Sequence, residues 1–422
     1  MSLNEAIELA RGNRYQEAFP YFEKAYQGEL DSFNEWSWYF YSKTLGKIGK
    51  LEAALKVNHF LLKKKPDFAP NLNLYGWHLH KSSIKNADNE EKLLSAANFI
   101  VKHTKQEQYS PYERTVIEVL KFMKDKPNTN YNQVLYWTEQ LDPKLLNQEV
   151  FSFTTDEGKR MEIASPLEFW YQHRIRALFE TKQYEGCSSL VDEAMSAIKS
   201  FHYSNDIWFR IRQAVSIGQL GDVEDAIVRL HAIGREKQYW TVYQELFHLY
   251  IQQEKFEKAL EMGSFALLEK SGEFKHKIKL LVHMGFALEK IDKPKEALLH
   301  YCFVVKLRAD NNWPIIPKIE DRIALLQQEE SAPNNIKREL IEFWKEIKLQ
   351  SLPKGTGKVK SLLPKGNAGF IESNTGEDLF FQVRNVRTRK IDVNSKVNFH
   401  IMNSFDQKKQ RESKEAIEIV VI

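Results

Sequence analysis

Two kinds of hydrophobic periodicity divide the chain of 422 residues. Up to about residue 350, apolar side chains recur at the spacing of amphipathic helices. From Thr356 onward, apolar and polar residues alternate, and clusters of Gly and Asn interrupt the alternation, which is typical of short strands. The pattern predicts a mainly α-helical body followed by a small β-barrel.

A short recurring pattern marks the start of every second helix in the helical part. The pattern consists of a first residue that is often aromatic, then an acidic residue, then a small residue with Leu or Ile beside it. It begins at Tyr15, Leu51, Tyr184, Val223, Phe256 and Pro294. The small residues at 18 and 54 are 36 positions apart, and those at 187, 226, 259 and 297 are 39, 33 and 38 apart. Periods near 34 residues indicate stacked antiparallel helix pairs, in which the small residue allows close approach.

The best single unit runs from Glu35 to Pro66, with Trp38 in its first helix and Ala54 in its second. With these residues it resembles the tetratricopeptide family, and the resemblance extends over most of residues 1–310 with drifting spacing. It implies an α-solenoid, which is a curved stack of helix pairs whose concave groove takes a protein or peptide partner.

The same patterns give the expected domain limits. We predict a helical repeat domain at 1–330, a capping helix and linker at 331–355, and a barrel at 356–422. Residues 75–165 are irregular within the repeat domain, with helices expected at Glu91–His103, Pro111–Lys124 and Asn132–Glu139 and turns or loops at 125–130 and 154–158. An amphipathic helix at Ile336–Gln350 would cover the end of the repeat array.

Four segments of the C-terminal part carry a second resemblance: Gly357–Lys360, Ala368–Ile371, Asp378–Phe381 and Val397–Phe399. Together they resemble the cold-shock domain, a five-stranded oligonucleotide-binding (OB) barrel. The resemblance implies that Phe370 and Phe380 stack unpaired bases, with Gln382 beside them. This sequence lacks most of the aromatic side chains with which the family stacks bases. At the positions where the family usually has aromatic rings or His, it has Ser361, Leu362, Ala368, Gln382 and Val383. An alternative is therefore that the barrel is only a cap or a protein-docking module.

Charge supports nucleic-acid contact. The whole chain has 61 Lys and Arg against 57 Asp and Glu, a net charge of +4, and residues 351–422 hold 13 of these cations against 8 acids. The basic excess therefore lies in the barrel, where it could follow a phosphate backbone. The residues expected to hold phosphate are Lys358, Lys360, Lys365, Arg384, Arg387 and Arg389. The alternative is that this charge cluster only solvates the surface.

The repeat register also assigns residues to the concave face of the solenoid. The candidate partner-binding residues are Lys43, His173, Arg176, Arg212, Glu245, His248 and His283. Paired Lys and Asn residues, by which the tetratricopeptide family clamps a C-terminal carboxylate, are not found. The pattern therefore names no ligand, and the polar side chains could simply solvate the groove.

No motif for catalysis stands out. Gly355–Lys358 lacks the spacer and the final Ser or Thr of a phosphate loop, and no His-Glu-x-x-His or Cys-x-x-Cys is found. Only Cys187 and Cys302 occur, and neither a secretory leader nor an apolar stretch of about 20 residues is seen. The sequence thus predicts a cytoplasmic protein without enzymatic activity, metal or cofactor.

The reading that accounts for most of these patterns is a non-enzymatic adaptor. Its solenoid would bind a protein partner and its barrel single-stranded nucleic acid, RNA more than DNA. Two alternatives remain open: a purely protein-binding adaptor or peptide-responsive regulator, and a non-catalytic subunit of a nuclease, translation or defence assembly.

Overall fold

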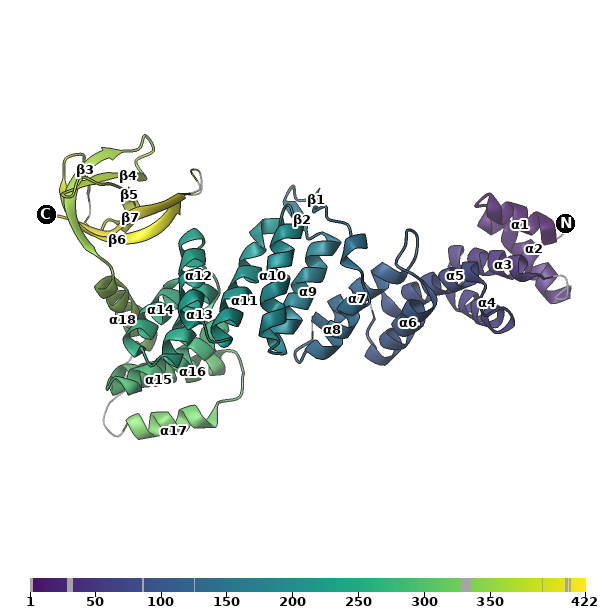
Figure 1. Cartoon of the computed structure of the whole chain (residues 1–422), viewed down its shortest axis with the longest axis horizontal. Helices are drawn as coiled ribbons and strands as arrows, with labels where there is room; N and C mark the ends of the chain where they lie inside the picture. Colours follow the sequence, from purple (N-terminus) through teal and green to yellow (C-terminus); the bar gives the residue numbers. More distant parts are fainter. Residues whose placement is uncertain are drawn as a thin grey trace. The chain divides into compact units, whose positions relative to one another are not determined.

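The computed structural model describes residues 3–28, 33–85, 87–124, 126–327, 335–388, 390–406, 409 and 411–422. The contacts within the chain define two compact units, Met1–Phe209 and Arg210–Ile422. Figure 1 labels their helices and strands. The predicted boundary between 330 and 331 lies outside the described residues.

The first unit consists of antiparallel helix pairs and one short hairpin (Figure 1). Its helices are α1 (Leu3–Arg11), α2 (Tyr15–Gly28), α3 (Glu35–Lys47), α4 (Leu51–Lys64), α5 (Ala69–Leu79), α6 (Glu90–His103), α7 (Tyr112–Lys124), α8 (Tyr131–Glu139), α9 (Pro166–Glu180) and α10 (Tyr184–Ala197). A π-helical turn, His80–Ile84, extends α5. Each odd-numbered helix packs against the even-numbered helix that follows it.

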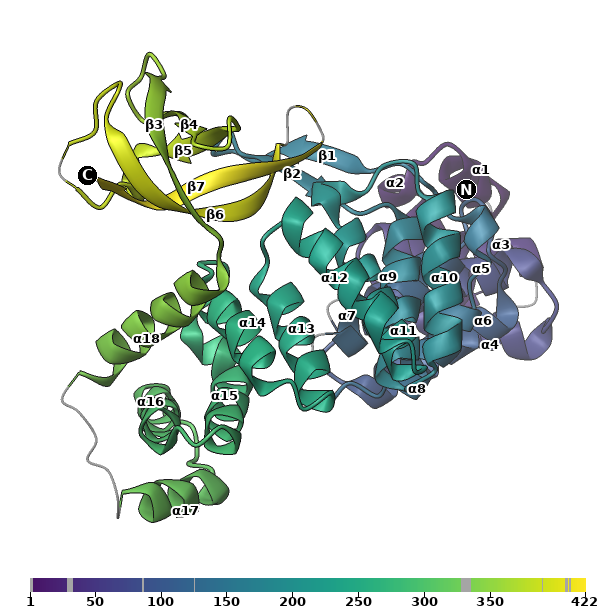
Figure 2. The same ribbon diagram turned by 60° about the vertical axis from the view of Figure 1, so that its left-hand side comes forward.

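The second unit continues the helix pairs and ends in a barrel. Its helices are α11 (Asp206–Gln219, which spans the unit boundary), α12 (Val223–Glu236), α13 (Trp240–Gln252), α14 (Phe256–Leu268), α15 (Ile278–Lys290), α16 (Pro294–Asp310), α17 (Pro317–Leu326) and α18 (Ile336–Ser351). The chain passes from α18 directly into the first strand of the barrel (Figure 2). The array is therefore of the tetratricopeptide type that the repeat pattern predicted.

The recurring sequence pattern marks real helix starts. Helices α2, α4, α10, α12, α14 and α16 begin at the six residues where the pattern begins. The small residues of the pattern are fully buried, at positions 18, 54, 187, 226, 259 and 297. Gly285 of α15 shows why such residues are needed, because a Cβ added there would lie 2.6 Å from Cε1 of Tyr301 on α16. Close helix contact in this array thus requires small residues at defined positions.

The irregular region was predicted well for its helices and incompletely for its loops. The three helices expected there are α6, α7 and α8, within one residue of their predicted limits. A turn does occur at 154–158, but strands β1 (Phe151–Thr154) and β2 (Arg160–Ile163) flank it as an antiparallel hairpin. No local pattern predicted this hairpin, because both strands are four residues long and have no buried face to impose alternation.

The C-terminal domain is a closed five-stranded barrel with the strand order β3-β4-β5-β7-β6. Its strands are β3 (Lys354–Leu362), β4 (Ala368–Ser373), β5 (Asp378–Gln382), β6 (Lys396–Asp406) and β7 (Arg411–Val421). All neighbouring strands are antiparallel except β5 and β7. Val359, Ile371, Phe381, Val397 and Phe399 belong to its core. The fold class is thus a helical solenoid followed by a barrel of the OB type.

Helix α18 lies where the amphipathic helix was predicted, one residue longer at its end, and we call it the cap of the helical array. It packs on α14 and α16 and buries Leu340 and Trp344 completely. The indole Nε1 of Trp344 donates a hydrogen bond of 2.9 Å to Nε2 of His300 on α16. Nδ1 of His300 lies 2.7 Å from the carbonyl oxygen of Glu296, so this nitrogen carries the proton. His300 is therefore a neutral tautomer fixed by one acceptor and one donor.

Acid should loosen this cap. Burial lowers the pKa of His300 to about 4, below the value of about 6.5 in an unfolded chain. As the pH falls from about 6.5 to 4, His300 becomes protonated in the unfolded chain but stays neutral in the folded chain. The contribution of this group to the free energy of unfolding is complete above pH 6.5 and is lost over this range. The expected loss from this group is about 3 kcal/mol. Urea denaturation at pH 7.0, 5.5 and 4.5 measures it.

The matched control is His300→Gln, which cannot titrate in this range. We expect it to be less stable than the natural chain at pH 7.0 but to lose less stability on acidification. Equal pH slopes for the two chains would show that His300 does not cause the acid sensitivity. His78, which is buried in the first unit and whose pKa burial also lowers to about 4, contributes the same amount to both chains.

Candidate nucleic-acid interface

The two predicted stacking rings lie together on the outer surface of the barrel. Phe370 of β4 and Phe380 of β5 are paired across the two strands. Their ring centroids are 5.8 Å apart with an interplanar angle of 68°, an edge-to-face contact. Their neighbours Ile371 and Phe381 are buried in the barrel core. Side chains alternate between the two faces of a strand, so Phe370 and Phe380 point away from the core. Phe370 is 36% exposed.

The glycine before Phe370 is required by the close packing of β3 and β4. A Cβ at Gly369 would lie 2.4 Å from the carbonyl oxygen of Ser361 and 2.8 Å from the ring of Phe381. Any larger residue would push β4 away from β3 and shift the ring that follows. The Gly-Phe pair of the sequence motif is therefore a structural requirement for the position of the ring.

A third ring was missed by sequence reasoning. Phe405, near the end of β6, lines the same hollow as Phe370 and Phe380. The hollow has a volume of about 930 Å³, and Lys360, Gln382, Lys409 and Arg411 also line it. The platform thus has three aromatic side chains, whereas the motif indicated two.

The cations around the platform divide into paired and unpaired groups. Nζ of Lys360 lies 2.5 Å from Oδ2 of Asp378, and this hydrogen bond raises the pKa of Lys360. A β-bulge follows Val359 in β3, so both Lys360 and Ser361 stand opposite Phe370. Asp378 is on β5, so the Lys360 side chain reaches across β4 to meet it.

The other residues that were predicted to hold phosphate differ in whether they are ion-paired. The guanidinium of Arg387 forms two hydrogen bonds to the carboxylate of Glu418, which raise its pKa. Burial raises the pKa of the Glu415 carboxyl, and the positive charge of the neighbouring Arg384 partly offsets this rise. Lys358 is on β3 and Lys365 in the turn before β4, both exposed. Arg389 lies outside the described residues.

Four cations of the barrel are the first candidates for phosphate contact. Within the described part of the chain, no acidic partner is found for Lys358, Lys365, Lys409 or Arg411. Lys409 and Arg411 line the aromatic hollow itself. These four cations are thus partly the predicted ones, Lys358 and Lys365, and partly Lys409, just before β7, and Arg411, its first residue.

The predicted groove residues are not equally placed. In the first unit, Lys43 lies over the ring of Phe40, and Arg176 lies between the ring of Tyr131 and the carboxylate of Glu180. His173 was expected to face the groove, but it is 7% exposed and its Nδ1 lies 2.7 Å from the carbonyl oxygen of Phe169. Helix α9 buries residues around much of its circumference, so a single concave stripe could not be projected onto it.

In the second unit, three predicted groove residues meet. Nδ1 of His283 on α15 lies 3.4 Å from Nε2 of His248 on α13, and Nδ1 of His248 lies 3.6 Å from Oε2 of Glu245. Burial and the neighbouring His248 lower the pKa of His283. Arg212 is half-buried on α11. Three of the four groove residues predicted in this unit are therefore in contact with one another.

Among the residues that the structure describes, His, Cys, Asp and Glu side chains do not form a group of three or more that could hold a metal ion. Of the helices in the same described ranges, none is both long enough and apolar enough to cross a membrane.

Solved structures that resemble the chain are helical proteins at low similarity. A human IFIT1 dimer with PPP-AAAA has 12% identity, covering 82% of this chain and 78% of that chain, with a TM-score of 0.38. A tetratricopeptide repeat protein from Parabacteroides merdae has 11% identity, covering 77% and 97%, with a TM-score of 0.29. A thermophilic repeat protein from Thermus thermophilus has 12% identity, covering 68% and 96%, with a TM-score of 0.20.

No protein-family model matches the sequence, and no curated protein matches it. The similarities to solved structures are too low to carry an argument about function. The class of protein therefore follows from the molecule itself: a tetratricopeptide-type solenoid joined to an OB-type barrel.

Proposed function

We propose that this chain is a non-enzymatic adaptor whose barrel binds single-stranded nucleic acid, RNA in preference to DNA, while its helical array binds a protein partner. The observation that carries the proposal is the surface pair of Phe370, which is 36% exposed, and the half-buried Phe380, with Phe405, Lys409 and Arg411 around one hollow. An aromatic ring can stack on an unpaired base, but a base inside a duplex offers no free face. The nearby cations neutralise the phosphates of the same strand.

The resemblance to cold-shock domains supports the same surface. Its Gly-Phe and Asp-Leu-Phe-Phe segments are the ones that bring Phe370 and Phe380 together on β4 and β5. Stacking contributes about 1–3 kcal/mol per base, largely without regard to sequence. The barrel should therefore bind single strands with little preference among bases, and its affinity should depend on salt.

The salt dependence can be predicted from the four candidate cations Lys358, Lys365, Lys409 and Arg411. Each phosphate neutralised on a single strand contributes about −0.7 to the slope of log K against log salt, so the expected slope is about −3. Between 50 and 200 mM salt, the affinity should then fall roughly 50-fold. Fluorescence-anisotropy titration of labelled single-stranded RNA and DNA with the full chain measures both the binding and the slope.

The variant Lys409→Gln with Arg411→Gln should make the slope less steep by about 1.4, since two phosphate contacts are lost. Lys306→Gln, an exposed lysine change on α16, is the control and should leave the slope unchanged. Absence of saturable binding at 50 mM salt would refute the nucleic-acid function.

A purely protein-binding adaptor remains the second candidate, because several barrel cations already have acidic partners. Lys360 pairs with Asp378, Arg387 with Glu418, and Lys414 with Glu377, while Arg235 of α12 pairs with Glu412 of the barrel. Such pairing lowers the charge that is available for phosphate. The same titration separates the two candidates, since a protein adaptor would show no salt-sensitive binding of oligonucleotides.

A further inference from the structure

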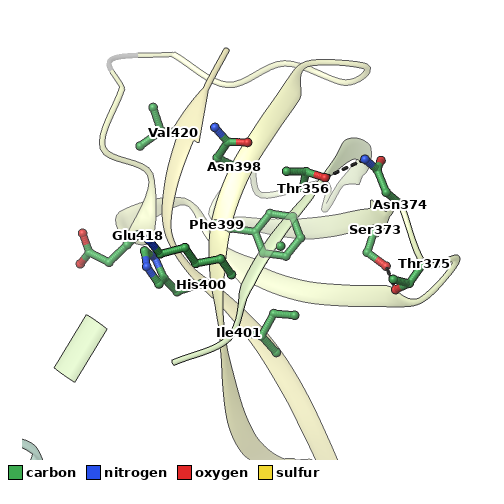
Figure 3. A pocket seen from close by; sticks show the side chains of 12 residues that line it. Thr356, Ser373, Asn374, Thr375, Asn398, Phe399, His400, Ile401, Glu418 and Val420 are labelled. Atoms are coloured by element: carbon green, nitrogen blue, oxygen red, sulfur yellow. Dashed lines mark hydrogen bonds between the residues drawn. The ribbon is translucent and has the colours of Figure 1, made fainter. Parts of the chain in front are cut away.

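The barrel has a second cavity at the opposite end of β3 from the aromatic platform. Its volume is about 570 Å³, which lies within the range of about 300–1,000 Å³ that small-molecule sites occupy. Figure 3 shows its side chains, with Thr356, Ser373, Asn374 and Thr375 on one side, His400 and Glu418 on the other, and the ring of Phe399 between them. None of these residues belongs to the platform.

The lining is rich in neutral hydrogen-bonding groups. Asn374 donates from Nδ2 to the hydroxyl of Thr356 at 2.6 Å, and the hydroxyls of Ser373 and Thr375 are 2.8 Å apart. Thr356 stands opposite Asn398 in the pairing of β3 and β6, so a second amide borders the same cavity. Amides and hydroxyls both donate and accept hydrogen bonds, as the edge of a base and the hydroxyls of a sugar require.

The charges of the cavity fit a nucleotide. Lys354 lines it and has no acidic partner within the described ranges. Glu418 would repel phosphate, but its carboxylate is neutralised by the two hydrogen bonds from Arg387. Burial, together with the neighbouring charge of Lys354, lowers the pKa of His400, so its ring is neutral near pH 7. Among the residues that line the cavity, Lys354 thus supplies the positive charge.

Strand β3 connects the cavity to the platform. Its exposed side chains Lys354, Thr356, Lys358 and Lys360 follow one another along the outside of the barrel, while Gly357 and Val359 between them are buried. The six steps between successive residues from Lys354 to Lys360 span roughly 20 Å. Lys354 and Lys358 therefore form a basic line that starts at the cavity, and Lys360, paired with Asp378, ends it at the platform.

Three rings account for only a few nucleotides, whereas one OB barrel covers about 4–16 nucleotides. The rest of a bound strand must lie on other parts of the barrel. We infer that a single strand stacked on Phe370 and Phe380 continues along β3 and places one further nucleotide in the cavity lined by Thr356, Asn374, Asn398 and His400. This inference rests on the proposed function of the barrel and adds a second nucleotide subsite to it.

The test compares short and long strands on the full chain. The probes are fluorescein-labelled oligouridylates of three and eight nucleotides, with oligothymidylates of the same lengths in parallel. An eight-nucleotide strand reaches from the platform to the cavity, whereas a three-nucleotide strand occupies one of them. The variant Thr356→Val with Asn398→Leu keeps the side-chain volumes but removes the hydroxyl and the amide. We expect it to bind the eight-nucleotide strand about tenfold more weakly and the three-nucleotide strand unchanged.

Two further variants make the outcomes separable. Asn403→Leu, also on β6 but outside both sites, should leave both affinities unchanged. Phe370→Ala with Phe380→Ala should weaken both strands. If this platform variant weakens binding but the cavity variant changes neither affinity, the second subsite is wrong and the proposed function stands. If the platform variant also has no effect, the proposed function itself fails.

Discussion

Replacing Phe370 and Phe380 together with Ala will weaken the binding of a single-stranded oligonucleotide by roughly 30-fold to 20,000-fold. Each ring is expected to contribute about 1–3 kcal/mol by stacking on one base. Both rings lie outside the barrel core, which is made by Ile371, Phe381 and their neighbours. The variant should therefore stay folded, and anisotropy titration beside thermal denaturation measures the two effects separately.

The conservative change to Tyr at both positions is the control, because a tyrosine ring also stacks. It should bind within a few-fold of the natural chain. A double Ala variant with undiminished affinity would show that the bases do not stack on these rings. Phe405→Ala should give a smaller loss of the same kind, since its ring borders the same hollow.

Replacing Trp344 with Ala will release the C-terminal cap of the helical array. Trp344 is fully buried, packs near the ring of Phe274, and donates to His300. Removing so large a buried side chain costs about 3–5 kcal/mol. Amide hydrogen exchange in α18 should rise far more than exchange in α13 and α14, because the cap loses its main anchor.

Two other tryptophan variants test what causes the loss of stability in Trp344→Ala. Trp344→Phe keeps most of the volume but leaves Nε2 of His300 without its donor, at a cost of about 1–3 kcal/mol. Trp313→Ala removes an indole that is 40% exposed and should have little effect. Equal losses for Trp344→Ala and Trp313→Ala would contradict the role of α18 as the cap.

The helical array could be predicted in detail because the residues that define each helix pair lie close together in the sequence. A small residue is needed where two helices touch, and it recurs at a fixed distance after each helix start. The pattern therefore placed six helix starts at the right residue. The hairpin β1–β2 carries no such constraint, since its side chains are largely exposed, and the sequence left no trace of it.

The barrel surface was only partly predictable, because its features depend on contacts between distant residues. The partners Lys360 and Asp378 are 18 positions apart, and Arg387 and Glu418 are 31 apart. No local pattern shows that these cations are already paired. Phe405 was missed because β6 continues well beyond the recognised Val397–Phe399 segment. The groove is a similar case: His248 and His283 do meet, whereas His173 is buried.

Photo-cross-linking is the measurement that tests the central claim most directly. A uridine-rich strand carrying 4-thiouridine would be irradiated with the full chain, and mass spectrometry would identify the linked peptides. Our account predicts cross-links in β4, β5 and the end of β6, at Phe370, Phe380 or Phe405. Cross-links confined to helices α1–α18, with none in residues 354–422, would contradict it.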